Sequence, residues 1–570
     1  MSFDLREIPF SRYGSYLCFR QYEGHHSTPD GFYLRAIHGD SNPAEALQLE
    51  LLVGGKPAAF STQGEPHCLR IEADKGEGFV EIVMPEPDVV RIRGRGAGLR
   101  LTNPCHSDFD NAIRRYEDRW QLNLYAAKTK LMLTSLDGAM VVDAPWEPKR
   151  SKHIVIDLLP EGSEKRFEAA IEEFRPEWNY RDYPMSFDKC LRQVDAEFRD
   201  WLKKTPRTPR SYSRTRELAA YLNWSSVAGA RGHLTRPGML MSKRHMTHLW
   251  SWDHCFNAIA LSYHNFPAAW DQMMVVFDNQ DPSGCLPDAL NDRIPRWQYV
   301  KPPIHGWALR QIMNNAEEIT SAHLREIYEP LSRWTNWWVN SRDDDGSGLP
   351  AYFHGNDSGW DNATIFDDGG PIEGPDLAAF LVLQMEVLAD VAERIGRRRE
   401  QKLWQMRAYE MLESLMETLW DGERFLAPRK FDGHVVEQGD CLLNFMPIIL
   451  GELLPKDVRR KLISGLRQSG RFFTKHGMAT ESPKSPKYQS DGYWRGPIWA
   501  PSTMLLVDGL ARSGQKGLAG EIARRFCKMC QAEGFAENFD AETGKGLRDL
   551  AYTWTSSVFL VLAHDYLLKK

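Results

Sequence analysis

The chain has 570 residues, 42% hydrophobic and 11% aromatic, and its 71 lysines and arginines against 77 acidic residues give a formal net charge of −6. This composition excludes an intrinsically disordered chain, and the charge forms no basic stripe of the kind that binds nucleic acid. Because the length exceeds one ordinary domain, we expect two domains, one of them large.

Targeting and cysteine signals are weak. The N-terminal segment MSFDLREIPF has no apolar core of a secretory signal, and the chain has no run of about 18 apolar residues. Only Cys527 and Cys530 form a CxxC pair among nine scattered cysteines, and no second Cys or His pair follows at zinc spacing. We therefore predict a cytoplasmic protein with reduced thiols that binds neither membrane nor nucleic acid.

The first 175 residues predict an antiparallel β-sandwich. Short segments rich in β-forming residues are separated by turn residues such as Gly54-Gly55 and Asp137-Gly138. So many short strands pack naturally as two sheets face to face. The predicted strands are 15–22, 31–39, 46–55, 68–73, 78–84, 89–94, 120–127, 130–136, 139–145 and 153–160.

Helical periodicity replaces this pattern near residue 165 and continues to the end of the chain. We predict a second domain over 176–570, whose paired helices could close into an (α/α)6 barrel. Spacing alone leaves a solenoid open, although no fixed-period repeat occurs. The predicted helices are 186–203, 213–229, 250–263, 266–279, 305–318, 322–340, 375–395, 397–419, 441–451, 456–468, 498–513, 515–532 and 553–568.

The connections between these helices share an unusual composition. They combine Trp, Asp, Asn, Gly and Arg in HLWSWDHCF, VKPPIHGW, HGNDSGWDNAT, DGYWRGPIW and AENFDAETG. An indole offers a flat apolar face with one donor at its edge, which suits the C–H faces and hydroxyl rim of a pyranose. Any single Trp is better explained as core, but the set together predicts a sugar-binding site.

Two carboxyl groups are needed to hydrolyse a glycosidic bond, one to protonate the leaving oxygen and one to activate water or attack carbon. Asp357 and Asp361 share one glycine-containing loop, and Trp360 beside Asp361 favours its protonated form. Glu537 lies in a second loop, 176 residues after Asp361. For an arbitrary acid among 77, a solvated surface position remains the simpler interpretation.

Four motifs in order, LWSWD, SGWDNAT, YWRGPIW and AENFD, resemble glycoside hydrolase family 63, which includes processing α-glucosidase I, bacterial α-glucosidases and mannosylglycerate hydrolase. The related trehalases of family 37 show similar motifs. The resemblance covers about residues 240–565 and implies an inverting hydrolase of α-linked glucosides or mannosides in small oligosaccharides or glycoconjugates. It implies a small carbohydrate as partner, no metal for the chemistry and no cofactor.

By the same resemblance, Asp361 matches the general acid and Glu537 the general base, with carboxyls about 6.5–9.5 Å apart to leave room for water. Asp357 stands where the family has Glu, and Ala363 where it has Ser, which puts fine substrate positioning in doubt. The residues expected to line the substrate pocket are Trp250, Trp252, Asp253, Trp307, Trp360, Asn362, Trp494, Arg495, Gly496 and Trp554.

Other functions remain open at this point. A trehalase is the nearest enzymatic alternative. A sugar epimerase on a helical barrel would move protons with histidines such as His305 and His354, and a phosphorylase would lack the base that Glu537 supplies. A non-catalytic sugar-binding protein would be favoured if either acid were replaced, and both are present. The sequence leaves the sugar, the linkage, the aglycone, the oligomeric state and any structural cation undetermined.

Overall fold

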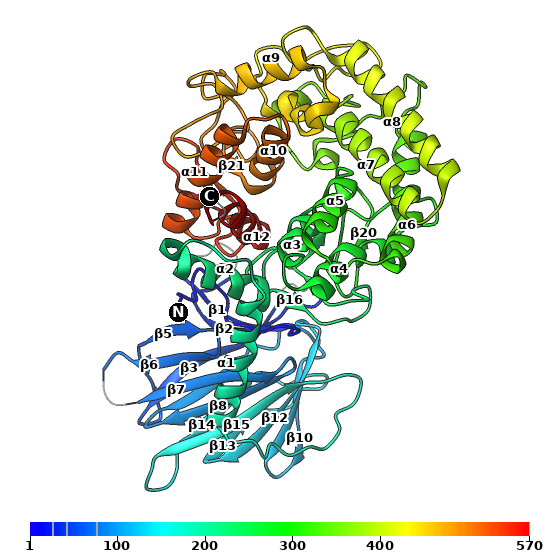
Figure 1. Ribbon diagram of the computed structural model, residues 1–570. Coiled ribbons are helices and arrows are strands. Elements are labelled where there is room, and N and C mark those ends of the chain that lie inside the picture. The colour runs from blue at the N-terminus through cyan, green and yellow to red at the C-terminus, as the bar shows by residue number, and fades with distance from the viewer. Residues whose placement is uncertain (25–27, 41–43, 76–77, 569–570) are drawn as a thin grey trace.

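The computed structural model describes residues 1–24, 28–40, 44–75 and 78–568. Figure 1 shows two parts, with β-strands at one end of the molecule and a ring of helices at the other. The change from strands to helices is therefore confirmed. It falls later than the predicted residue 165, since a strand still runs over Arg166–Glu173 and the first long helix begins at Phe187.

Two antiparallel sheets make up the N-terminal part. The first has the order β1-β2-β3-β9-β14-β13, with β4 on β3, and the second has the order β10-β11-β12-β15-β8-β7-β6-β5. The strands of the first sheet are β1 (Leu17–Tyr22), β2 (Gly31–Ala36), β3 (Glu45–Val53), β4 (Lys56–Pro57), β9 (Gly98–Asn103), β13 (Ala139–Asp143) and β14 (Ile154–Leu159). Those of the second are β5 (Phe60–Glu65), β6 (Cys68–Ala73), β7 (Phe79–Glu86), β8 (Val89–Arg95), β10 (Asn111–Tyr116), β11 (Arg119–Leu124), β12 (Thr129–Asp137) and β15 (Arg166–Glu173).

Alternating side chains explain how the sheets face each other. In β6, Leu69 and Ile71 are fully buried while their neighbours on the strand are more exposed. Strand β3 contacts β6, and β14 contacts β15, so the two sheets bury apolar faces against each other. Every predicted strand has a counterpart among the described residues. The sequence interpretation missed β4, β5, β9, β10 and β15, since short polar or charged strands such as β10 lack a strong hydrophobic signal.

Within the described residues, six helices contact one another in a closed ring, and Figure 1 shows the ring face on. The contacts run from α3 through α5, α7, η5, α10 and α12 and back to α3. The ring helices are α3 (Asp253–Leu261), α5 (His305–Asn315), α7 (Pro375–Arg394), the 3-10 helix η5 (Leu442–Leu453), α10 (Ala500–Arg512) and α12 (Thr553–Leu562), which ends in a π-helical turn over Ala563–Leu568.

An outer helix packs against each helix of the ring. For example, α4 lies on α3, α8 on α7 and α11 on α10. The outer helices are α2 (Ser213–Ser225), α4 (Phe266–Met274), α6 (Ser321–Ser341), α8 (Arg398–Leu419), α9 (Lys456–Arg467) and α11 (Lys516–Glu533), while α1 (Phe187–Lys203) packs on strand β7. All thirteen helices predicted from sequence are thus present in the described chain. The helix predicted over 213–229 ends earlier in the structure, because Val227–Ala228 form a strand. The helix predicted over 250–263 begins later, because Leu249–Trp250 form a strand.

Burial patterns separate the two layers of helices. In the outer helix α9, only Val458, Leu462 and Leu466 are buried, at a spacing of four residues that places them on one face. In the ring helix α7, burial extends around nearly the whole circumference. A helix that is apolar on all sides belongs inside a larger assembly, which is the position α7 occupies.

Buried polar contacts join the sheets to the helices. The His38 ring lies between two carboxylates, with Nδ1 2.8 Å from Asp292 Oδ2 and Nε2 2.6 Å from Glu173 Oε1. The buried Lys243 ammonium donates to backbone oxygens of Ser15 (2.6 Å) and Val227 (3.2 Å). Burial lowers the pKa of Lys243 to about 7. These contacts fix the strands against the base of the helical ring.

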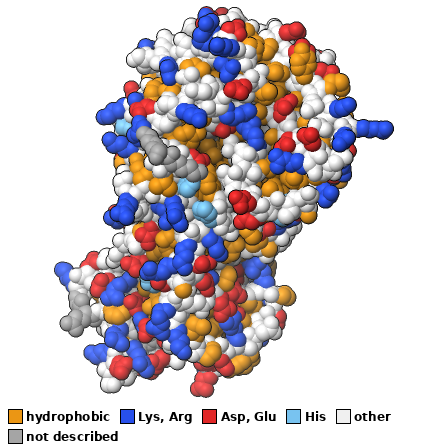
Figure 2. Space-filling view, in the orientation of Figure 1, with side chains coloured by type: hydrophobic (Ala, Val, Ile, Leu, Met, Phe, Trp, Pro, Cys, Tyr) orange, Lys and Arg blue, Asp and Glu red, His pale blue; other side chains and the backbone are white. Residues whose placement is uncertain are grey.

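No described helix is both long enough and apolar enough to span a membrane. On the face seen in Figure 2, lysine and arginine side chains are interspersed with aspartate and glutamate over both parts of the molecule. This mixed surface agrees with the small net charge of the chain and offers no broad field of one sign on that face.

The ring requires glycine where α10 meets η5. A Cβ on Gly509 would lie 2.8 Å from the backbone carbonyl carbon and oxygen of Ile448. We expect Gly509→Ala to destabilise the fold by ~1–3 kcal/mol, because neither backbone can move without opening the ring. Gly520→Ala in α11, where nothing lies within 4 Å, should stabilise it by ~0.5–1 kcal/mol. Thermal unfolding measures both, and a Gly509→Ala protein as stable as the wild type would contradict this packing.

Candidate active site

The sequence motifs meet where helices of the ring begin. Trp252 and Asp253 are the N-cap and first residue of α3, and Trp499 and Tyr552 are the N-caps of α10 and α12. Short antiparallel strands brace the preceding segments: β18 (Leu249–Trp250) pairs with β19 (Ala289–Leu290), which pairs with β20 (Pro295–Arg296). Likewise β21 (Ile498–Trp499) pairs with β22 (Asn538–Phe539), which pairs with β23 (Gly546–Leu547).

The loop that carries Asp361 is fixed by tight packing. Gly359 has a positive φ of 74°, and a Cβ there would lie 2.5 Å from the Trp252 ring, so this position requires glycine. Asp357 is buried and holds the loop by accepting hydrogen bonds from Arg342 (3.1 Å) and from the backbone N–H of Val300 (3.2 Å). Asp357 therefore has a structural role here, and its carboxylate is already fully engaged.

Asn362 joins this loop to the YWRG segment. Its side chain accepts a hydrogen bond from the Trp494 N–H (2.9 Å) and donates one to the Gly492 carbonyl (3.0 Å). Its own carbonyl accepts from Arg495 Nε (2.8 Å), and Arg495 also pairs with Asp367. Asp361 and Arg495 therefore belong to one site, but the Arg495 guanidinium is engaged in holding the loop.

Five tryptophans form one buried aromatic cluster behind these loops. Trp494 and Trp499 stack with ring centroids 3.9 Å apart and an interplanar angle of 5°. Trp360 lies 4.8 Å from Trp494, and Trp554 lies 5.6 Å from Trp499 and 5.8 Å from Trp252. None of the five exposes more than 3% of its surface. The cluster is a rigid wall that ties the motifs together, and it offers little area for a sugar ring to stack on.

The remaining predicted pocket residues lie at different depths. Trp307 is fully buried and donates from Nε1 to Asp508 (2.9 Å), so it packs inside the ring. Gly496 is required for close approach, since a Cβ would lie 2.3 Å from the Gln489 carbonyl oxygen. Trp250 is partly exposed and Trp297 exposes 43% of its surface, so these two indoles have accessible faces.

Three carboxyl groups surround a single buried ammonium. Lys301 forms an ion pair with Asp288 (3.0 Å) and donates to the Asn356 carbonyl (2.7 Å), and its charge acts on both Asp253 and Asp361. Burial raises the pKa of Asp361 to about 6, with Lys301 partly opposing the shift. Burial likewise raises the pKa of Asp253 well above its usual range. One cation among three acids favours keeping protons in this cluster.

Glu537 lies in a second polar cluster, which the YWRG segment lines. The Tyr493 hydroxyl lies close enough to the Glu537 carboxylate to favour its ionised form, and Arg548 acts on the same carboxylate as an opposing charge. Glu537 exposes 5% of its surface, and this burial raises its pKa to about 7. Its backbone is held by a 2.7 Å hydrogen bond to the Asp549 carbonyl, and its carbonyl accepts from the Trp554 indole (3.4 Å).

Tyr493 links the two clusters and was missed by the sequence interpretation. Burial raises the pKa of the Tyr493 hydroxyl, and the nearby charges of Glu537, Asp361 and Asp253 raise it further. Tyr493 has a positive φ of 64°, an uncommon conformation for a bulky residue that the surrounding structure must stabilise. Lys301 was missed as well, although it stands in VKPPIHGW, one of the stretches selected for their composition. Asp288 carried no signal in the sequence.

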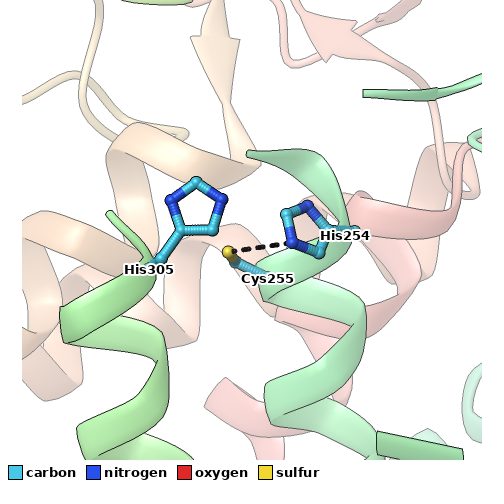
Figure 3. Close-up of side chains that lie close together, drawn as sticks. All are labelled: His254, Cys255 and His305. Carbon is cyan, nitrogen blue, oxygen red and sulfur yellow. Dashed lines mark hydrogen bonds between the residues drawn. The ribbon is translucent and has the colours of Figure 1, made fainter. Parts of the chain in front are cut away.

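The described residues contain one group with metal-ligand chemistry, His254, Cys255 and His305. All three are fully buried behind the segment that carries Trp252 and Asp253, and Figure 3 shows them from α3 and α5. Asp253, which follows Trp252, acts electrostatically on Cys255.

Comparison with known proteins shows which family this chain resembles. Residues 246–555, more than half of the chain, match the family model of the mannosylglycerate hydrolase MGH1-like glycoside hydrolase domain. A mannosylglycerate hydrolase of Rubrobacter radiotolerans is 25% identical, over 59% of this chain and 93% of the relative. A glucosylglycerate hydrolase of Mycolicibacterium hassiacum is 23% identical, over 55% and 91%.

A solved structure shares the fold. The family 63 mannosylglycerate hydrolase of Thermus thermophilus, in complex with glucose, matches with a TM-score of 0.54 at 19% identity, over 60% of this chain and 98% of that one. The resemblance inferred from the four motifs is confirmed. The chain belongs to the mannosylglycerate hydrolase MGH1-like glycoside hydrolases of family 63, and it is a glycosidase.

Proposed function

We propose that this glycosidase hydrolyses α-linked glucosides or mannosides of small molecules with inversion, using Asp361 as general acid and Glu537 as general base. The observation that carries the proposal is the environment of Tyr493. Its hydroxyl contacts Glu537 and feels the charges of Asp361 and Asp253, so carboxyls from three separate loops surround one point. A sugar bound there would have an acid and a base within reach.

The acid would act from the loop between Gly355 and Phe366. Asp361 keeps part of its surface accessible and has a pKa of about 6, so it can hold a proton at mildly acidic pH. Protonation of the glycosidic oxygen by Asp361 would let the bond break through an oxocarbenium-like transition state. Asp253 and Lys301, which share the cluster, would position sugar hydroxyls.

The base would act from the opposite loop. Ionised Glu537 would take a proton from a water that attacks the anomeric carbon, and Tyr493 would keep the carboxylate oriented by its hydrogen bond. Inversion needs room for this water, so the productive carboxyl separation is about 6.5–9.5 Å. Asp361 takes up a proton again, and Glu537 releases one, before the next cycle.

A glycosylglycerate is the substrate class we infer first. Two relatives carry names of enzymes that hydrolyse mannosylglycerate and glucosylglycerate. Beside the acid, where the leaving group would sit, the exposed His354 acts on Asp361 electrostatically, and its ring lies tilted against that of Tyr299 with centroids 4.9 Å apart. His354 uses Nδ1 to accept from the Asn356 N–H, which leaves Nε2 for an anionic aglycone. The partly exposed Trp250 and Trp297 offer faces for a sugar.

The architecture supports the same proposal. We infer that the ring and its outer helices form an (α/α)6 barrel over residues 176–570, preceded by a β-sandwich domain over 1–175. The closed order of contacts around the ring supports this assignment. The epimerase alternative loses one of its two candidate histidines, since His305 is fully buried, while His354 is exposed beside Asp361.

The experiment that tests this function is a screen of mannosylglycerate, glucosylglycerate, trehalose, α-glucobioses and α-mannobioses. We expect turnover of a glycosylglycerate and the β-anomer of the sugar as first product, detected by NMR before mutarotation. An α-anomer would overturn the inverting mechanism. Preference for trehalose would keep the mechanism but replace the proposed substrate.

Replacement of the two carboxyls should separate their roles. We expect Asp361→Asn and Glu537→Gln each to lower kcat by ~10²–10⁴-fold on the natural leaving group. An aryl glycoside with an acidic phenol needs no proton from the enzyme, so it should restore much of the rate to Asp361→Asn but none to Glu537→Gln. The matched controls are Asp368→Asn and Glu542→Gln, exposed acids close to each position in sequence. Near-normal turnover by either active-site variant would show that the wrong carboxyl was chosen.

The two pKa values predict a narrow dependence on pH. Asp361 must be protonated and Glu537 ionised, so kcat/KM of the free enzyme should fall below a pH of about 6 and above a pH of about 7. Since the base has the higher pKa, only a small fraction of the enzyme carries both groups in the productive form, even at the optimum.

The variant Tyr493→Phe tests whether Glu537 causes the fall of kcat/KM at high pH. Loss of the hydroxyl removes a hydrogen bond that favours ionised Glu537, so the pKa of Glu537 should rise. We expect the alkaline limb to move to higher pH while the maximum rate falls, because still less Glu537 is ionised. If the maximum rate rose instead, the roles of acid and base would be exchanged. An unchanged profile would place Tyr493 outside the titrating pair.

A further inference from the structure

A buried cluster of nitrogen and sulfur donors lies beneath the WSWD segment. His254 and Cys255 are the second and third residues of α3, and His305 is the first residue of α5. Their candidate ligand atoms all lie within 4.8 Å of one another, and none of the three side chains is exposed. In Figure 3 the sulfur of Cys255 lies between the two imidazole rings.

Hydrogen bonding prepares His254 as a ligand. Its Nδ1 lies 3.2 Å from the Trp250 carbonyl, so this nitrogen donates and carries the proton. The lone pair therefore resides on Nε2, which points to Cys255 Sγ at 3.7 Å. A backbone carbonyl that fixes the tautomer and the ring orientation is the usual support of a metal-bound histidine.

His305 supplies the second, independent observation. Neither of its ring nitrogens makes a well-formed hydrogen bond to a described residue, although the backbone of Ser251 lies near enough to favour its charged form. An imidazole always has a donor or an acceptor at each nitrogen, and burying both without partners destabilises the fold. Such orphaned groups in a native interior are explained by a bound water or a bound ion.

We propose that His254 Nε2, Cys255 Sγ and one ring nitrogen of His305 bind a single Zn²⁺ ion. Zinc takes imidazole nitrogen and thiolate sulfur as its preferred protein ligands, at about 2.0–2.1 Å and 2.3 Å. Binding would draw the three donors closer together and release the Cys255 thiol proton to solvent. The Cys255 thiolate would offset part of the charge of the ion.

The ion would have a structural role. It would join the start of α3 to the start of α5, and so fix Trp252 and Asp253 from behind. No step of the proposed hydrolysis passes through it, because all three side chains are fully buried and out of reach of a sugar. Zinc content and turnover are measured separately, so failure of the metal proposal is distinguishable from failure of the proposed function.

The test uses the full chain, stripped with a chelator and then exposed to Zn²⁺ or to Co²⁺ as a spectroscopic probe. After removal of excess metal, elemental analysis should find about one zinc per chain, with a higher Tm than the stripped protein. Co²⁺ should give a thiolate-to-cobalt charge-transfer band. Cys255→Ala and Cys255→Ser should lose that band and most of the zinc, and His305→Gln should bind more weakly.

Cys527→Ala is the matched control, since Cys527 is another fully buried thiol whose sulfur lies 3.9 Å from the Phe559 carbonyl. It should keep its metal. Substoichiometric zinc in the wild-type chain after reconstitution, or equal zinc in the wild type and Cys255→Ser, would overturn the proposal and leave a buried water as the partner of His305. If Cys255→Ala does not fold, Cys255→Ser and the wild-type cobalt spectrum still decide the question.

Discussion

The site depends on one geometric constraint: helices α3, α10 and α12 begin at the same end of the ring. Aromatic contacts hold these starts together, since the Trp554 ring lies 5.8 Å from that of Trp252 and 5.6 Å from that of Trp499. The chain that enters each helix must therefore pass through the same small volume. Residues that are hundreds of positions apart become neighbours there, and the carboxyls they carry lie away from bulk solvent.

As a result of this convergence, the carboxyl groups of the site are buried, and nearby cations compensate their charge only in part. The charge of Lys301 acts on Asp361, and that of Arg548 acts on Glu537. Each cation offsets only part of the desolvation, so both carboxyls titrate above their usual range. A fully paired site would hold both groups ionised and leave no proton for the leaving group. A site without cations would leave no base.

Particular elements show what sequence alone could predict. The thirteen helices were foreseen because long periodic segments such as α7 carry a strong signal. Strand β10 was missed because four of its six side chains are exposed, so it shows no apolar face. Within the candidate site, LWSWD, SGWDNAT, YWRGPIW and AENFD led to the family, and the structure brings the loops that carry them together. Tyr493, in contrast, looks in sequence like any core aromatic, and only its contact with Glu537 and its positive φ distinguish it.

His254 and His305 stand 51 positions apart with no ligand spacing, so their proximity arises from packing of α3 on α5 and leaves no trace in local periodicity.

The abundance of tryptophan in the loops has a different physical reason from the one that the sequence suggested. Their abundance suggested open platforms for sugar rings, yet Trp252, Trp360, Trp494 and Trp554 are almost wholly buried. Stacking and edge contacts instead give a wall with few alternative packings. Asn362 attaches the acid loop to this wall through Trp494, and the Trp554 indole attaches the base loop through the Glu537 carbonyl. The wall therefore ties the Asp361 loop to the Glu537 loop, and for the proposed inverting hydrolysis a fixed separation of these carboxyls matters more than another surface for stacking.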